Sequence, residues 1–230
     1  MAFDLKDLGS YFDSSAHATK DATANKYGVA SSSDAVLLYE QVVGELLHVL
    51  DLSPTARVLD VGCGTGEVLE RIASRCPDIL GLDLSSGMTE IVKAKGHRAL
   101  AYDGGVFPFE DSSFDVAIVY QVFINLPSAD IAENLLREAV RVTRKGGTIL
   151  IGAVPHPAWS RMPTHDRSWW VNTKIWLRRL AGRQTIPYYA YDYSFFGRLF
   201  DSLKLERLAF ARCSVPRKGW ETKYHVILTR

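Results

Sequence analysis

The sequence predicts an α/β fold in which a mostly parallel β-sheet is covered by helices on both faces. Short apolar runs, typical of buried parallel strands, alternate along the chain with stretches of helical hydrophobic periodicity. A turn containing three glycines joins the first strand to a helix, and the next strand ends in an acid. Strands and helices that alternate at these lengths require right-handed crossovers, which build a parallel sheet.

The first strand and its turn occupy the most informative segment, Arg57–Glu67. The strand, 58–61, carries three apolar residues in four positions, as expected of a strand covered on both faces. Gly62, Gly64 and Gly66 follow it, and glycines allow a sharp turn because no Cβ obstructs the backbone. The segment therefore predicts that the main chain closely approaches a bound ligand.

The second strand, Asp78–Asp83, adds a carboxylate at its end. In nucleotide-binding α/β folds, an acid about 20 residues after the glycines accepts hydrogen bonds from ribose hydroxyls. A dinucleotide would require the spacing G-x-G-x-x-G and would rest its pyrophosphate on the helix N-terminus. Here the spacing is G-x-G-x-G, and Glu67 would repel a pyrophosphate. S-adenosylmethionine, which has an ammonium and a sulfonium but no phosphate, is favoured, and a dinucleotide is the alternative.

The other elements are predicted in chain order. A helix begins at the start signal Ser31–Asp34 and ends at Ser53–Pro54. After the first strand, helices are expected near 66–75, from Ser85 to Gly96, and along the face of Ile131, Leu135, Ala139 and Val142. Further strands are expected at 79–83, near 97–102, at 114–120 and at 148–154. A helix near 194–202 and two antiparallel strands near 204–212 and 221–229 close the chain.

The length of 230 residues fits one domain, predicted to span residues 34–230. Residues 1–33, rich in Ser, Ala, Thr and Asp, are predicted to form a loosely structured N-terminal arm. Residues 155–193 are rich in Trp, Tyr and Arg and follow the fifth predicted strand. They are expected to form a helical, aromatic lid that covers a substrate, although aromatic residues that merely pack on the sheet would give the same pattern.

The composition excludes several classes of protein. A net charge of +1 gives no basis for binding a polyanion, so a nucleic-acid partner is not expected. The three cysteines, Cys63, Cys76 and Cys213, form no C-x-x-C pair, so neither a disulfide framework nor a metal site is expected. The sequence lacks an apolar run of membrane-spanning length and begins without the pattern of a signal peptide. We therefore expect a cytoplasmic protein without a membrane partner.

Four segments resemble the motifs of a known enzyme family. Val58–Gly66 resembles motif I of the class I S-adenosylmethionine-dependent methyltransferases, and Gly81–Met88 resembles their second motif. Asp103–Val116 is similar to the third motif and the strand that follows, and Arg141–Leu150 to the helix end, glycine turn and fifth strand. The resemblance covers residues 35–154, with the motifs in the family's order. It implies a small-molecule methyltransferase of the type 11/12-like group, with a Rossmann-like, doubly wound, seven-stranded sheet that is mostly parallel and has an antiparallel last strand.

The resemblance also implies a set of cofactor-binding residues. Gly62, Cys63 and Gly64 would contact S-adenosylmethionine through the main chain, and Asp83 would bind its ribose. Asp60 would reach the ammonium through water or orient the loop, although a purely structural role is a close alternative. The remaining candidates are Leu84 and Met88 over the adenine face, Asp103 and Gly104 at the adenine edge, Gln121 beside the methionine part, and Tyr11 and Tyr27 closing over the cofactor from the arm. Their alternative roles are ordinary turns, helix packing, a helix cap, and aromatic packing on the domain surface.

Two histidines are candidates for a general base. Val154–Pro157 resembles the His-Pro step of several small-molecule methyltransferases and contains His156. His165 lies in the lid, and histidine titrates near neutral pH. Either side chain could instead be packed or solvated.

The segment after the fourth predicted strand excludes some classes of methyl acceptor. It lacks the N/D-P-P-Y/F quartet of enzymes of this fold that methylate DNA bases or glutamine amides. A small-molecule acceptor that is methylated on oxygen or nitrogen is therefore expected, while its identity and the oligomeric state are left open. The alternatives are a methyltransferase-fold protein with other chemistry or no catalysis, and an NAD-dependent oxidoreductase.

Overall fold

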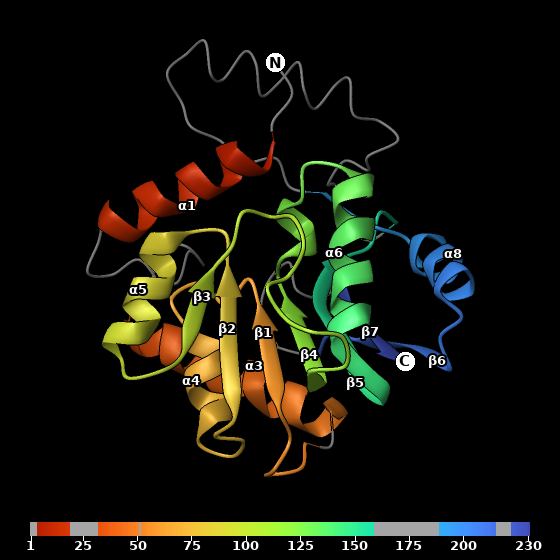
Figure 1. Ribbon diagram of the computed structural model, residues 1–230, viewed down its shortest axis with the longest axis horizontal. Helices are drawn as coiled ribbons and strands as arrows, with labels where there is room; N and C mark the ends of the chain where they lie inside the picture. Colours follow the sequence, from red (N-terminus) through yellow and green to blue (C-terminus); the bar gives the residue numbers. More distant parts are fainter. Residues whose placement is uncertain (1–3, 19–31, 51, 159–188, 215–221) are drawn as a thin grey trace.

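The computed structural model describes residues 4–18, 32–50, 52–158, 189–214 and 222–230 (Figure 1). Its helices are α1 (Leu5–Ala18), α3 (Ser32–Leu50), α4 (Glu67–Ala73), α5 (Ser86–Ala94), α6 (Ala129–Val142) and α8 (Tyr193–Leu203), together with the short 3₁₀ helix η1 (Phe123–Asn125). Its strands are β1 (Val58–Val61), β2 (Ile79–Asp83), β3 (Ala99–Ala101), β4 (Phe114–Tyr120), β5 (Thr143–Pro155), β6 (Arg207–Arg212) and β7 (Lys223–Thr229).

The strands form one seven-stranded sheet in the order β3-β2-β1-β4-β5-β7-β6. Strands β1 to β5 pair in parallel, whereas β7 runs antiparallel to both of its neighbours, β5 and β6. This arrangement confirms the predicted Rossmann-like sheet with an antiparallel last strand. The order reverses direction at β1, so the carboxyl ends of β1 and β4 flank the position where ligands bind in open α/β sheets.

Helices cover both faces of the sheet, and each face has its own apolar core (Figure 1). The core beside α6 and α8 is rich in aromatic rings, including the fully buried Phe123, Phe196 and Tyr224. The core beside α3 and α4 is mainly aliphatic, with Leu46 and Leu69 fully buried. Strands β1, β2, β4 and β7 are almost entirely buried, as their apolar sequences predict, whereas the edge strands β3 and β6 are partly exposed.

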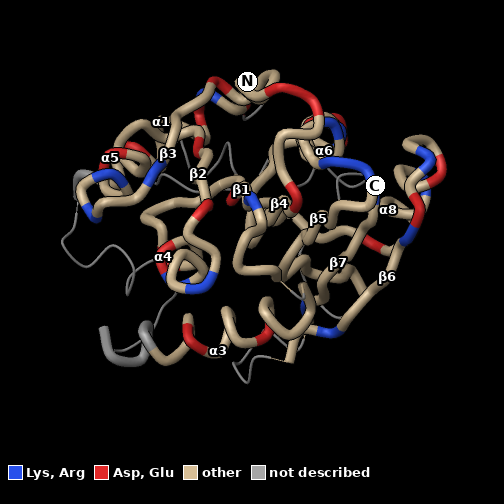
Figure 2. Tube along the Cα trace, turned by 60° about the horizontal axis from the view of Figure 1, so that its bottom comes forward, with Lys and Arg blue, Asp and Glu red and all other residues tan. Residues whose placement is uncertain are grey.

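Charged residues lie mainly on the helices and in the loops, while the middle of the sheet carries few of them (Figure 2). Polar side chains begin several helices: Ser85 caps α5, Ser128 caps α6, and Asp192 caps α8. Each cap accepts a hydrogen bond from an N–H of the first turn, which satisfies a donor that has no partner within the helix. None of the helices in the described segments is both long and apolar enough to cross a membrane.

The N-terminal arm differs from its prediction, because residues Leu5–Ala18 form the regular helix α1. Asp4 and Asp7 exchange side-chain hydrogen bonds with each other's backbone N–H groups, at 2.9 and 3.2 Å, and this reciprocal cap starts the helix. Leu8 is buried, so the helix is also held by packing. The composition of the arm concealed a short amphipathic helix whose stability depends on the rest of the fold.

Strand β5 is longer than predicted, because it begins at Thr143 and runs to Pro155. Thr143 already pairs with Phe114 of β4, and a register shift then precedes the regular pairing from Thr148 onward. A second shift interrupts the pairing of β5 with β7 between Ile151 and Val154. The proposed lid falls largely outside the described residues, which include only its two ends, 155–158 and 189–193.

Candidate functional site

The glycine turn after β1 adopts a conformation that side chains rarely allow. Gly62, Gly64 and Gly66 have φ angles of 71°, 54° and 88°. A Cβ added at Gly62 would lie 2.3 Å from Cγ2 of Val122, in the loop after β4. Glycine is therefore required at position 62 both by conformation and by space. The turn and the end of β4 meet at this point, as the predicted site requires.

Asp83 lies at the carboxyl end of β2 and is buried. One of its carboxylate oxygens accepts the Gly64 N–H at 2.8 Å, and the other accepts the Ser85 N–H at 2.9 Å. A carboxylate can accept up to about four hydrogen bonds, so these contacts are compatible with further donors such as ribose hydroxyls. The structure thus joins the glycine turn directly to the acid that the sequence predicts as the ribose ligand.

Tyr102 and Asp103 directly follow β3, the strand whose last residue, Ala101, pairs with Asp83. The Tyr102 N–H donates to the Asp83 carbonyl at 3.0 Å, and the Gly105 N–H donates to the Asp103 carboxylate at 2.9 Å. Burial, together with the negative charges of Asp83 and Asp103, raises the pKa of Tyr102 well above its usual range. A neutral phenol beside two acids is a feature of the site that the sequence analysis did not identify.

Helix α1 lies across this edge of the molecule, next to α5 (Figure 1). The Asp13 carboxylate accepts the Ser85 hydroxyl at 2.6 Å and the Gly87 N–H at 3.0 Å, at the N-terminus of α5. An acid in this position also suits the positive end of the helix dipole. The sequence analysis missed Asp13, since its partners lie 72 and 74 residues away.

Leu84, a candidate for the adenine face, and Gly104, a candidate for the adenine edge, lie next to each other, under α1. A Cβ added at Gly104 would come within 2.7 Å of Leu5 Cδ1 and within 3.1 Å of Leu84 Cδ2. Gly104 has a φ of 89°, so its loop also depends on glycine. Leu5 thus joins the candidate site, and no local sequence signal pointed to it.

Gln121 follows β4 and has a φ of 59°, which is rare for a residue other than glycine. Its N–H donates to the Gly152 carbonyl at 3.0 Å, and its carbonyl accepts the Asn125 side-chain N–H at 3.2 Å. Among the described residues, Gln121 Nε2 and Asn125 Oδ1 are buried without a hydrogen-bond partner. Buried amide atoms of this kind are suited to a bound ligand. Asn125 is a second residue that the sequence analysis did not identify.

His156 lies just beyond the end of β5 and packs among aromatic residues. Its ring is 4.7 Å from that of Tyr193 and 5.8 Å from that of Tyr224. The Ala158 N–H donates to His156 Nδ1 at 3.2 Å, so the proton of a neutral imidazole resides on Nε2. This contact occupies one nitrogen, and catalysis by His156 stays a prediction.

The roles of several other candidates stay predictions. Tyr11 lies in α1 beside Phe12, with ring centroids 5.4 Å apart. Asp60, Cys63 and Met88 are buried near the carboxyl edge of the sheet. Tyr27 and His165 lie outside the described residues.

The assembled residues fit S-adenosylmethionine better than a dinucleotide. The main-chain cradle from Gly62 to Gly66 has no room for a Cβ at its first glycine, and Asp83 is buried at its side. Glu67 begins α4 directly after the cradle, where it is partly buried. A carboxylate at this helix N-terminus competes with a pyrophosphate but is compatible with a ligand that bears positive charge.

Comparisons with known proteins agree with this geometry. Residues 59–151 match the family described as "Methyltransferase domain". A malonyl-[acyl-carrier protein] O-methyltransferase of Serratia marcescens is 34% identical over 145 residues, which cover 57% of this chain and 54% of that protein. The chain spans about half the length of the curated relatives it matches.

Two solved structures share the fold. An S-adenosylmethionine-dependent methyltransferase from Archaeoglobus fulgidus has a TM-score of 0.60 and 14% identity, covering 84% of this chain and 94% of that one. Geranyl diphosphate C-methyltransferase from Streptomyces coelicolor A3(2), solved with S-adenosyl-L-homocysteine, has a TM-score of 0.64 and 13% identity, covering 98% and 97%. Residues 59–151 of this chain are thus similar to a methyltransferase domain, and the chain shares its fold with two methyltransferases of known structure.

Proposed function

We propose that this protein transfers a methyl group from S-adenosylmethionine to an oxygen or nitrogen atom of a small-molecule acceptor. The observation that carries the proposal is the hydrogen bond of 2.8 Å between the Gly64 N–H and Asp83. It holds the cradle and the ribose acid in one unit, as a nucleoside site requires. The O-methyltransferase named above supports oxygen as an acceptor atom.

Alignment is the main contribution that we assign to the chain. When bound, the cofactor supplies a methyl group on a sulfonium, which is already a good leaving group. In this proposal the cradle and Asp83 would hold the nucleoside, and Gln121 would contact the methionine part. Positioning of this kind can lower a barrier by about 7–11 kcal/mol, whereas a general base adds about 10²–10⁴ in rate. His156 and His165 are the candidates for that base, and His156 would have to release the Ala158 N–H to act through Nδ1.

The proposed setting is a reducing cytoplasm. The three cysteines form no disulfide, which is the usual state of cytoplasmic proteins. The aromatic residues at the ends of the lid support a small, partly apolar acceptor, since such pockets are lined mainly by apolar and aromatic side chains. No nucleic-acid or membrane partner is proposed.

Calorimetry and an activity assay test this function in two stages. We expect S-adenosylhomocysteine to bind in a titration and NAD to give no binding. A methyl-transfer assay with labelled donor is then run against a panel of hydroxyl and amine compounds. Absence of S-adenosylhomocysteine binding would contradict the proposal outright. Binding without transfer to any member of the panel would favour other chemistry, or none, on the same fold.

A further inference from the structure

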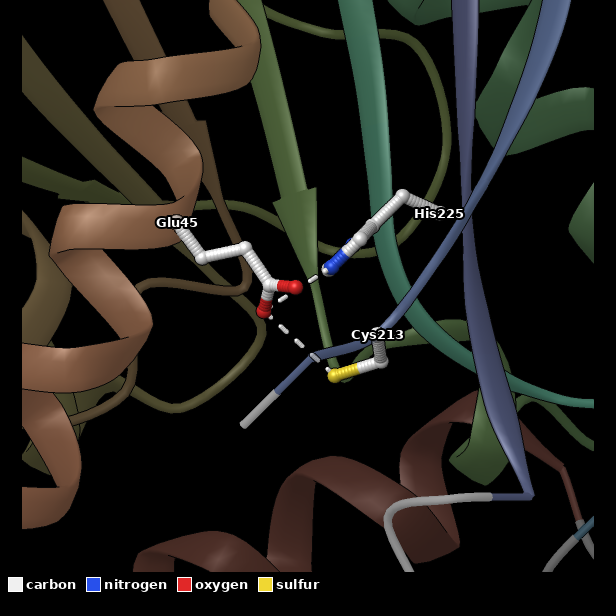
Figure 3. Close-up of side chains that lie close together, drawn as sticks. All are labelled: Glu45, Cys213 and His225. Atoms are coloured by element: carbon white, nitrogen blue, oxygen red, sulfur yellow. Dashed lines mark hydrogen bonds and ion pairs between the residues drawn. The ribbon is translucent and has the colours of Figure 1, made fainter. Parts of the chain in front are cut away.

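A buried polar cluster lies on the α3 face of the sheet (Figure 3). Glu45 comes from α3, Cys213 follows β6, and His225 lies in β7. Glu45 Oε2 is 3.2 Å from His225 Nε2 and 3.5 Å from Cys213 Sγ, and the two side chains of the Glu45–His225 pair are only 9% and 1% exposed. Polar groups buried to this degree require a specific reason.

These three residue types also make zinc sites, and the three ligand atoms lie within 4.8 Å of one another. The Ala153 N–H donates to His225 Nδ1 at 3.3 Å, however. A backbone N–H can only donate, so Nδ1 must accept and Nε2 must carry the proton of the neutral ring. An imidazole bound to zinc through Nε2 ordinarily carries its proton on Nδ1, where it would oppose the Ala153 N–H. The contacts of His225 therefore fit an imidazole that lies beside a carboxylate better than a zinc ligand.

Glu45 is the anion of this cluster. Its other oxygen accepts both the N–H and the hydroxyl of Ser214, the latter at 2.8 Å. Burial acts to raise the pKa of Glu45, but the hydrogen bonds from His225 and Ser214 outweigh it and lower the pKa to about 2. The Glu45 carboxylate thus lies 3.2 Å from His225 Nε2 and favours the tautomer that carries its proton there and accepts from Ala153.

Ala153 connects this pair to the candidate site. It has a φ of 56° and lies in the interruption of β5–β7 pairing, between Ile151 and Val154. Its neighbour Gly152 accepts the Gln121 N–H, and Gln121 also has a positive φ. Two residues in a disfavoured conformation thus stand side by side at the carboxyl edge, and such conformations persist only where surrounding contacts enforce them.

We propose that Glu45 and His225 are positioning residues, which hold Ala153 in its left-handed conformation and thereby place Gln121 at the ligand-binding edge. The inference rests on the proposed function, because Gln121 is placed for a bound cofactor. Gln121 has its N–H and carbonyl fixed from two sides, and its buried Nε2 has no partner among the described residues. The fixed main chain therefore orients a donor that the cofactor or the acceptor would satisfy.

The test compares Glu45→Gln with Val42→Ala, a core substitution on the same helix that leaves the pair intact. S-adenosylhomocysteine affinity is measured by calorimetry for both, and stability by denaturant unfolding. We expect Glu45→Gln to weaken binding about tenfold, which corresponds to the lower end of the strain that a disfavoured residue stores. We expect Val42→Ala to lower stability without changing affinity. Equal losses of affinity in both variants would overturn the proposal, and so would no loss in Glu45→Gln.

Ala153→Gly provides the rescue, because glycine adopts a positive φ without enforcement. In that background, Glu45→Gln should cost little affinity, about twofold or less. An undiminished loss would contradict a route through Ala153. If the unsubstituted protein binds no S-adenosylhomocysteine, the proposed function is wrong. If it binds but the variants do not behave as expected, only the positioning role of Glu45 and His225 is wrong.

A spectroscopic measurement on the unsubstituted protein covers the case in which Glu45→Gln does not fold. Long-range ¹H–¹⁵N spectra of the His225 ring report which nitrogen carries the proton. We expect the Nε2–H tautomer, with no change on addition of Zn²⁺. A proton on Nδ1, or coordination of Zn²⁺ by this ring, would overturn the assignment.

Discussion

The two edges of the sheet use acidic side chains in opposite ways. At the amino edge, Asp78 pairs with Arg98, and Asp115 accepts the Arg57 N–H and pairs with Arg144. These ion pairs are partly or largely exposed. At the carboxyl edge, Asp83 is buried and accepts the backbone N–H groups of Gly64 and Ser85.

This difference in burial indicates that the acids of one edge contribute to stability and those of the other edge to ligand binding. Exposed ion pairs contribute about 0–1 kcal/mol, because water and salt screen them. A buried carboxylate held by backbone N–H groups is already oriented and largely stripped of water, so a ligand that reaches it gains strong, charge-assisted hydrogen bonds. Acids at the carboxyl edge should therefore govern ligand affinity, while those at the amino edge should affect only folding.

The largest effect is expected from the two acids at opposite ends of strand β2, Asp83 within the strand and Asp78 directly before it. Asp83→Asn should weaken S-adenosylhomocysteine binding about a hundredfold, since a hydrogen bond to a charged group contributes about 1.5–3 kcal/mol. Asp78→Asn, directly before the first residue of the same strand, should leave affinity unchanged. Calorimetry of the two variants compares the edges directly. Similar affinities would contradict the view that only acids at the carboxyl edge govern ligand binding.

Two glycines with a positive φ, one in the candidate site and one outside it, allow a second comparison. Gly62 and Gly96 both have a positive φ, but a Cβ at Gly62 would meet Val122, whereas a Cβ at Gly96 would meet nothing within 4 Å. Gly96→Ala should lower the free energy of unfolding by about 1 kcal/mol through φ alone. Gly62→Ala should lower it by about 1–3 kcal/mol more and should also weaken S-adenosylhomocysteine binding. Denaturant unfolding gives the first quantity, and equal losses in the two variants would contradict the close approach of β4.

A smaller effect is expected where α1 meets α5. Asp13→Ala removes the acceptor of the Ser85 hydroxyl and the Gly87 N–H, and should lower stability by about 1 kcal/mol, as the loss of a helix cap does. Ser14→Ala, one residue further along the exposed side of α1, is the control. Hydrogen exchange of the α1 amides should increase in the first variant only. Unchanged exchange in Asp13→Ala would show that packing alone holds the helix.

The smallest effect is expected at the amino edge and depends on pH. Hydrogen bonds from Arg144 and from the Arg57 N–H lower the pKa of Asp115 below the ordinary range of an aspartate. A lowered pKa means that this carboxylate stabilises the fold fully above its unfolded pKa and loses that contribution as pH falls through its folded pKa. Asp115→Asn should therefore reduce stability by less than about 1 kcal/mol at pH 7, and the difference should vanish in strong acid. A difference that persists or grows in acid would contradict the sign of the shift.

The sequence predicted the carboxyl edge well where the signal is local. The glycines, the end of β2 and the alternation of strands and helices all lie within short segments, so their spacing was enough to predict the turn, the acid after it and the parallel sheet. Contacts made by distant residues were missed. Glu45 and His225 are distant in the sequence and meet only in the folded chain. The positive φ of Ala153 lies at an interruption in strand pairing, which no residue type in the sequence indicates. Helix α1 was missed for a related reason, since its docking residue Asp13 is defined by partners on α5.

A crystal structure with S-adenosylhomocysteine tests the central claim most directly. The account predicts that the ribose hydroxyls donate to the Asp83 carboxylate while the Gly62–Gly66 turn lies against the same ligand. A sugar bound at any other place on the protein, with Asp83 contacting only Gly64 and Ser85, would contradict it.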